Sequence, residues 1–349
     1  MKGMVNSNES HLCGQIMNDK PNVSEPANEN STVPADLEIA IIGLEEGLAK
    51  SLNDAISELV VFFGTQFDLS GLDGITVASE YSKALLDLDR GYISSHRLTP
   101  SNTYGVGVAM SPSVIRNGVH KCHLLFDAMN FLEMLHAKQQ GRVINLLAHE
   151  CAHVEARQRF DSAFPGVLLK KQMDTLDSYR WDVILACWDE FTACWRSAQF
   201  GQIPCDEYEV IFLRALSDTR QKANASITSY RLHGDISRVV PEVTGAYGNL
   251  LKYSAYHLGH LEGKNLNWRQ MPSTVDGLSG HWFQSVFEAL EDALKELAET
   301  YGSWTSDALF LIIGDIAEEL LVDGGMRFYR NDDGTVGVDI PMTPETTPT

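Results

Sequence analysis

One stretch of the chain limits its fold more than any other: residues 141–160, with the sequence GRVINLLAHECAHVEARQRF. Apolar residues fall on nearly every side of a helix built from this stretch, so the helix must be buried on several faces. The rest of the chain must supply the packing partners. Yet His149, Glu150 and His153 lie in the middle of that apolar surface, where polar groups without partners would be costly.

The spacing of these three side chains indicates a metal site. His149 and His153 are four residues apart, so they project from one helix face about a turn apart. Two imidazoles at that spacing can hold one tetrahedral Zn²⁺, and zinc brings the pKa of a bound water towards roughly 7. Glu150 lies about 100° round the helix, where it can take a proton from that water without being a ligand. We predict one zinc per chain with Glu150 as general base. The alternative is two core histidines bonded to backbone carbonyls.

A catalytic zinc needs a third protein ligand, and the next helical segment offers Glu190. Glu190 is at the centre of a stripe of small residues, which would let this helix approach the first one closely. Asp189 falls on a different stripe that looks solvated and is the second candidate ligand. Without a metal, Glu190 would pair with a base such as Arg157. The small residues are Ala148, Cys151 and Ala152 on the first helix, and Ala186, Cys187, Ala193, Cys194 and Ser197 on the second.

The HECAH segment followed by a helical Glu190 resembles the zincin metallopeptidases, specifically the gluzincin branch, over about residues 74–199. The resemblance implies zinc-dependent hydrolysis of peptide bonds in an α+β, zincin-like fold. It also implies a small mixed sheet before the zinc helix, with an edge strand that holds the substrate. Here Gly105–Pro112 or His120–Asp127 would be that strand. The helical E-x-x-A of Glu190–Ala193 is also similar to small cytosolic zincins of the ImmA/IrrE type.

The chain departs from the patterns of two zincin branches. A metzincin would continue the motif with Gly and then His, where this chain has Ala156 and Arg159, so that branch is excluded. The thermolysin-like branch places an Asp four residues after the ligand Glu to support a histidine. Cys194 stands there in this chain, so the support of the imidazoles must be built differently.

The order of patterns predicts an α+β chain with a mainly helical second half. We expect a disordered tail at 1–35, a zincin-like metal-binding domain at 36–200, a helical subdomain completing the cleft at 201–325, and a terminal hairpin with a disordered tail at 326–349. Expected helices are 37–66, 128–138, 140–160, 175–200, 206–230, 240–260, 279–300 and 304–322. Expected strands are Ile75–Ala78, Tyr104–Met110, His120–Phe126, Met326–Tyr329 and Val336–Ile340.

Composition narrows the partners of the chain. Its net charge is −20 with no basic run, which argues against nucleic acid as a partner. The apolar runs are too short to cross a bilayer, and the cysteines show no disulfide spacing, so we expect a cytoplasmic protein away from membranes. A peptide or protein is the expected substrate.

Two matters stay open from the sequence. Tyr253, Tyr256, His257 and His260 are all candidates for the group that stabilises the oxyanion. A catalytically silent regulatory protein of the same fold, and a zinc hydrolase of a non-peptide substrate, are the alternative functions.

Overall fold

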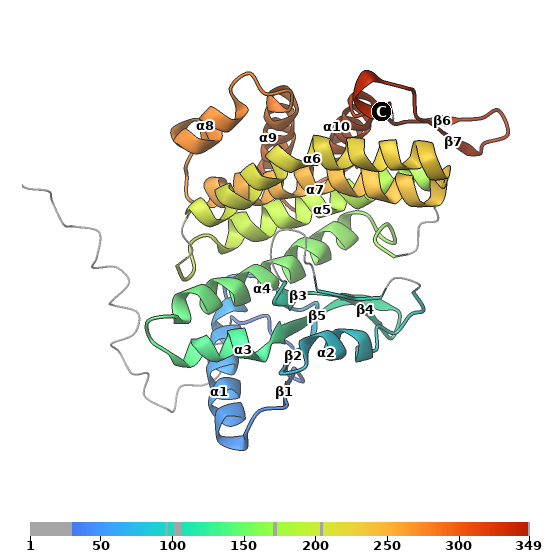
Figure 1. Cartoon of the computed structure of the whole chain (residues 1–349). Coiled ribbons are helices and arrows are strands. Elements are labelled where there is room, and N and C mark those ends of the chain that lie inside the picture. Colours follow the sequence, from blue (N-terminus) through green and yellow to red (C-terminus); the bar gives the residue numbers. More distant parts are fainter. Residues whose placement is uncertain (1–29, 95–96, 101–106, 170–172, 203–204, 348–349) are drawn as a thin grey trace, which may run out of the picture.

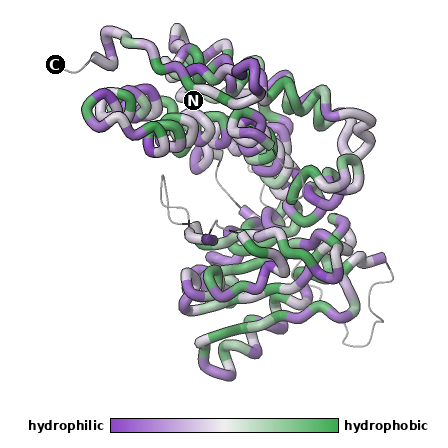
Figure 2. The backbone as a smooth tube through the Cα atoms, turned by 90° about the vertical axis from the view of Figure 1, so that its right-hand side faces the viewer, coloured by the Kyte–Doolittle hydropathy of each residue, from purple (hydrophilic) through white to green (hydrophobic). Residues whose placement is uncertain are grey.

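The computed structural model describes residues 30–94, 97–100, 107–169, 173–202 and 205–347. These residues form ten α-helices and a small mixed sheet, so the chain is α+β as predicted. One half holds the sheet and the other half is helical, and the long helix α4 (Gln140–Ala163) lies between them (Figure 1). Figure 2 shows the same two halves from the side.

The sheet runs in the order β1-β2-β5-β3, and β4 also pairs with β5. Parallel pairing joins β1 to β2 and β2 to β5, whereas β3 and β4 are antiparallel to β5. The side chains of β5 alternate, so that Cys122, Leu124 and Phe126 enter the core under the sheet while Leu125 packs against α2. The strands are β1 (Glu38–Ile42), β2 (Leu72–Ala78), β3 (Ala109–Met110), β4 (Ser113–Arg116) and β5 (Val119–Asp127).

Two expectations for this half are corrected. Residues 38–42 form an outer strand, β1, instead of the start of the expected helix 37–66. His120–Asp127 belongs to β5, which is paired on both sides, so it cannot be a free edge. The edge next to α4 is β3 with the residues that follow it, which is the described part of the other candidate, Gly105–Pro112. Residues 104–106 lie outside the described residues.

The helical half packs α5, α6 and α7 side by side, with α9 and α10 against them (Figure 1). Glycines on α7 allow the close approach to α5, because a Cβ on Gly259 would stand 2.2 Å from the carbonyl oxygen of Phe191. The helices are α1 (Glu46–Phe63), α2 (Tyr81–Asp87), α3 (Ala128–Phe131), α5 (Thr175–Ser197), α6 (Cys205–His233), α7 (Ile236–Gly263), α8 (Pro272–Leu278), α9 (Gln284–Glu299) and α10 (Ala308–Asp323).

Burial of α4 on several faces follows from its place between two hydrophobic cores. Leu147, Cys151 and Ala152 join the core under the sheet, whereas Phe160 near its end joins the core of the helical half. The sequence prediction for 141–160 is therefore confirmed. None of the helices in the described part of the chain combines the length and apolar character that crossing a membrane requires.

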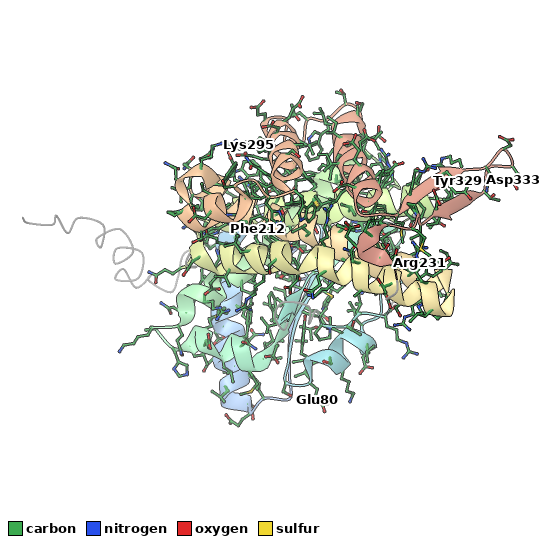
Figure 3. All side chains as sticks on the ribbon, turned by 45° about the horizontal axis from the view of Figure 1, so that its top comes forward. Glu80, Phe212, Arg231, Lys295, Tyr329 and Asp333 are labelled. Carbon is green, nitrogen blue, oxygen red and sulfur yellow. The ribbon has the colours of Figure 1, made fainter. Side chains whose placement is uncertain are left out.

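The two predicted tails are partly ordered. Residues 1–29 lie outside the described residues, but Thr32 bonds to the carbonyl oxygen of Gly64 at 2.9 Å and holds the chain against the end of α1. The predicted hairpin forms from β6 (Arg327–Arg330) and β7 (Val336–Asp339), and Figure 3 shows it projecting from the helical half with Asp333 near its tip. After it, Thr346 is buried.

Candidate metal centre

Helix α4 brings His149, Glu150 and His153 into one buried group. Each of the three is at most 7% exposed, and one ligand atom from each lies within 4.8 Å of the others. The two imidazoles face each other with their Nε2 atoms 3.1 Å apart. The arrangement predicted from the four-residue spacing is therefore present, and this group could hold a metal ion.

Helix α5 adds the carboxylate of Glu190 to this group. Its Oε2 atom lies 3.4 Å from Nε2 of His149 and 3.4 Å from Nε2 of His153. Ala193, one turn further along α5, packs in the same core as Cys151 and Ala152 of α4. The small residues thus allow the approach that the sequence suggested.

The three atoms form a triangle whose size can be tested against zinc. Its sides are 3.1, 3.4 and 3.4 Å. Bonds of about 2.0–2.2 Å from a tetrahedral zinc to nitrogen and oxygen place neighbouring ligand atoms about 3.3–3.5 Å apart. Oε2 of Glu190 is buried and has no hydrogen-bond partner of good geometry among the described residues. The donor set and its spacing therefore fit one small cation.

The charges of the group favour a cation at its centre. Burial would raise the pKa of Glu190, but the neighbouring imidazoles of His153 and His149 outweigh it and hold the pKa well below the usual value. Burial would likewise lower the pKa of His153, but Asp189 and Glu190 raise it to about 10. Positive charge is thus strongly stabilised here. A bound metal supplies such charge and displaces protons from its ligands.

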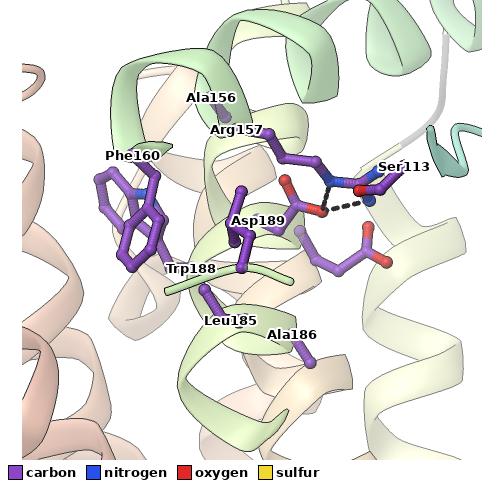
Figure 4. Close-up of a pocket in the computed structure, with 10 residues that line it drawn as sticks. Ser113, Ala156, Arg157, Phe160, Leu185, Ala186, Trp188 and Asp189 are labelled. Carbon is purple, nitrogen blue, oxygen red and sulfur yellow. Dashed lines mark hydrogen bonds and ion pairs between the residues drawn. The ribbon is translucent and has the colours of Figure 1, made fainter. Parts of the chain in front are cut away.

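Asp189 orients His153 and does not face solvent, which corrects the sequence interpretation. Its side chain is 16% exposed, and its Oδ1 lies 3.0 Å from Nδ1 of His153. Its other oxygen accepts from Arg157 at 2.7 Å (Figure 4). Carboxylates behind a metal-binding imidazole fix its ring and its tautomer. Asp189 therefore points the Nε2 of His153 towards Glu190, and Arg157 pairs with Asp189 instead of with Glu190.

Cys194 supports the other imidazole. Its Sγ lies 3.9 Å from Nδ1 of His149, at the place where the sequence had shown the departure from the thermolysin-like pattern. Burial raises the pKa of the Cys194 thiol well above its usual value, although a hydrogen bond with Tyr208 opposes this. Cys194 is therefore a neutral thiol, and Nδ1–H of His149 can donate to its sulfur.

A pocket of about 370 Å³ opens onto the group from the helical half and the edge of the sheet. The ring of Tyr256 stacks on His149, with centroids 6.0 Å apart and planes 5° apart. Burial and, next, the charge of the nearby Glu190 carboxylate raise the pKa of Tyr256 well above its usual value. The lining residues are Gly107, Ala109, Met110, Ser111, His149, Glu150, His153, Arg157, Glu190, Tyr208, Ile211, Lys252, Tyr253 and Tyr256.

A second pocket of about 310 Å³ adjoins the first (Figure 4). Arg157 and Glu190 line both pockets, so the ion pair of Arg157 with Asp189 lies at the boundary between the two pockets. Arg157 also donates to the carbonyl oxygen of Ser111, just after β3. The edge of the sheet, α4 and α5 are thereby tied together beside the histidines. The second pocket is otherwise mainly apolar, with Phe160, Leu168, Leu185 and Trp188 among its lining residues.

Of the four candidates for the oxyanion donor, the structure brings only Tyr253 and Tyr256 to the pocket. His257 bonds instead to the Thr274 hydroxyl at 2.9 Å, and His260 packs on the ring of Tyr208. Neither histidine is among the residues that line the pocket.

Sequence reasoning also missed residues that line the pocket. Tyr208 and Lys252 line the pocket from α6 and α7, and no local pattern marks them. Arg157 was considered only as a partner for Glu190, although it is one turn after His153 on the same helix. That four-residue spacing could have shown that Arg157 lies near whatever supports His153.

Comparisons with known proteins add no relative: no protein-family model matches the chain, and no curated protein or solved structure matches it either.

Proposed function

We propose that this chain is a zinc-dependent peptidase with a zincin-like, gluzincin-type site. One observation carries the proposal. Three buried donor atoms of His149, His153 and Glu190 converge at the spacing of zinc ligands, and Glu150 lies beside them in a pocket. When bound, zinc would polarise the scissile carbonyl and lower the pKa of a coordinated water.

The residues of the chain would divide the remaining work. Glu150 would take the proton of the attacking water and pass it to the leaving nitrogen, which is the role of a general base that becomes a general acid. The ring of Tyr256 stacks on His149 and lines the same pocket, so its hydroxyl would donate a hydrogen bond to the oxygen that gains charge. Burial is the largest of the effects that raise the pKa of Tyr256 well above its usual value, so the Tyr256 hydroxyl keeps its proton.

The edge of the sheet would hold an extended substrate. Ala109, Met110 and Ser111 line the pocket on the outer side of β5, where no further strand of the described residues covers β3. Peptides bind such edges by adding a strand, with main-chain hydrogen bonds along the edge. The neighbouring pocket, which has apolar walls beside Arg157, Asp189 and Glu190, would then take one side chain of the substrate.

Substitution of the proposed base tests the proposal. Glu150→Gln keeps the shape of the side chain but cannot accept the proton, so hydrolysis of a diverse peptide mixture should fall about 10²–10⁴-fold. Mass spectrometry of the products gives the rates, and the zinc content should stay that of the wild type. Glu58→Gln, at an exposed position of α1, is the matched control and should leave the rate unchanged.

Two results would contradict the proposal. Full hydrolysis by Glu150→Gln would show that Glu150 is not the base. A zinc-loaded wild type that cleaves no peptide in the mixture would favour a regulatory role or a non-peptide substrate, and a screen of ester and amide substrates would separate those two.

A further inference from the structure

Lys252 lines the metal pocket, which is the pocket that opens onto His149 and Glu190, and its ammonium group has no acidic partner among the described residues. It lies on α7, is half-buried and lines the pocket together with Glu190 and His149. Within the described ranges, no carboxylate lies within the 4.0 Å that defines an ion pair for its ammonium group; its recorded partner is the ring of Tyr253, 4.9 Å away. The pocket's other basic side chain, Arg157, is already bound by Asp189.

The chain has 47 acidic side chains against 27 Lys and Arg, so an ammonium group has many carboxylates with which it could pair. Ion pairs form at Lys50, Lys83, Lys222 and Lys295, whereas Lys121, Lys138 and Lys264 form none among the described residues, like Lys252. Lys252 differs from those three because it lines the metal pocket, where a ligand's carboxylate could meet its charge.

The position of Lys252 on α7 places it near residues that contact the metal ligands. Lys252 comes four residues before Tyr256, so the two side chains are neighbours on one face of the helix, with Cβ atoms about 5–6 Å apart. Tyr256 in turn stacks on His149. Lys252 therefore lines the same pocket as the metal ligands, within reach of a ligand bound to them.

We propose that Lys252 binds a carboxylate of the substrate and selects for peptides that carry one close to the cleaved bond. The carboxylate belongs either to an Asp or Glu side chain or to a free C-terminus. This inference rests on the proposed function, because it names the substrate class of the same site. A charge-assisted hydrogen bond to the ammonium group supplies the selectivity.

The first test measures binding and needs no hydrolysis. Alkyl hydroxamates with a terminal carboxylate, and their methyl esters, are titrated by calorimetry into the zinc-loaded full chain, with one to four methylenes between the two groups. Hydroxamates bind zinc, so the series measures the reach from the metal to Lys252. For the best length, the carboxylate should bind about tenfold tighter than its ester in the wild type.

Two variants show whether Lys252 causes that preference. Lys252→Met keeps the length of the side chain, and the ratio of affinities should fall to near one. Lys50→Met removes the same charge from an exposed site and should keep the ratio. Equal binding of acid and ester by the wild type, or a preference that survives in Lys252→Met, overturns the inference.

The second test uses peptides and separates the two sources of the carboxylate. Pairs that differ by Glu and Gln, and pairs with a free or an amidated C-terminus, are cleaved by wild type and Lys252→Met. A preference within one pair that is lost in the variant supports the inference and identifies the source. Cleavage without preference in either pair overturns it while leaving the proposed function intact. If no peptide is cleaved but the hydroxamate preference depends on Lys252, the proposed function fails and the carboxylate site stands.

Discussion

Two buried groups of histidine and glutamate lie in this chain, and they are built in different ways. The metal group is His149, His153 and Glu190. The second group, which we call the α7–α8 network, is His257, Thr274 and Glu209. In the α7–α8 network, the Thr274 hydroxyl donates to Glu209 at 2.8 Å, so it can only accept from His257 at 2.9 Å. Each of these two hydrogen bonds therefore has one donor hydrogen and one acceptor.

In the metal group, the two imidazoles and the carboxylate meet one another directly, and no hydroxyl of the described residues links them. Two Nε2 atoms and one carboxylate oxygen converge at 3.1–3.4 Å, and the opposite nitrogens of both rings have their own neighbours in Asp189 and Cys194. The comparison teaches that histidine and glutamate burial alone does not indicate a metal site. Convergence of two imidazole nitrogens and a carboxylate oxygen at the spacing of zinc ligands favours one, because a single cation can bind all three atoms.

Removal of the metal should separate the two groups most clearly. Zinc at a hundred to a thousand times its Kd would add about 3–4 kcal/mol to the free energy of unfolding, so a chelator should lower the Tm by about 5 °C. Calorimetric scans with the chelator, and again after zinc is returned, measure the effect. Glu190→Ala should not respond to the chelator, whereas a variant of the α7–α8 network such as His257→Gln should respond like the wild type. A wild-type Tm that ignores both chelator and zinc would break the comparison.

Asp189→Asn should give the next largest effect. The substitution removes the charge behind His153 and leaves Arg157 without its partner, so the zinc Kd should rise about 10–100-fold. Competition with a chromophoric chelator measures the Kd. Asp182→Asn, at an exposed position of the same helix, is the control and should bind zinc like the wild type. Equal affinities in both variants would show that Asp189 does not support the site.

Acid should weaken the α7–α8 network by a smaller amount. Burial lowers the pKa of His257 to about 3, so it stays neutral in the folded chain while the unfolded chain takes up a proton below about 6.5. The unfolded state then binds more protons, and the free energy of unfolding falls as the pH drops from 6.5 towards 3. This one group contributes about 1.4 kcal/mol per pH unit.

Urea denaturation of the metal-free protein between pH 7 and pH 5 measures this slope. His257→Gln should flatten it, and His233→Gln, at an exposed histidine, should not. An unchanged slope in His257→Gln would mean that His257 is already protonated in the folded state.

The sequence predicts α4 and its ligands well because the information is local. Residues four apart on one helix must share a face, and a helix that is apolar all round must be covered. Glu190 could be found because its small neighbours allow close packing. The role of Asp189 could not be found in this way. Helix periodicity gives the direction of a side chain on α5, but it does not give the width of the interface between α5 and α4. Asp189 is one residue from Glu190 and lies at the border of that interface.

The sheet shows a different limit. Residues 38–42 are a short apolar run that leads directly into α1, and periodicity cannot separate a short strand from a helix there. β4 was missed even though Asn117-Gly118 precedes β5. Both residues have positive φ, 54° and 79°, as a tight hairpin turn requires. That dipeptide could have predicted the hairpin, and with it the edge beside the metal group.

The metal content of the purified chain tests the central claim most directly. Elemental analysis of the wild type, His149→Ala and Glu190→Ala, with His257→Ala as a control from the α7–α8 network, counts the ions per chain. The account predicts about one zinc in the wild type and in His257→Ala, and none in the other two variants. No zinc in the wild type after growth with zinc, or full zinc in Glu190→Ala, would contradict it.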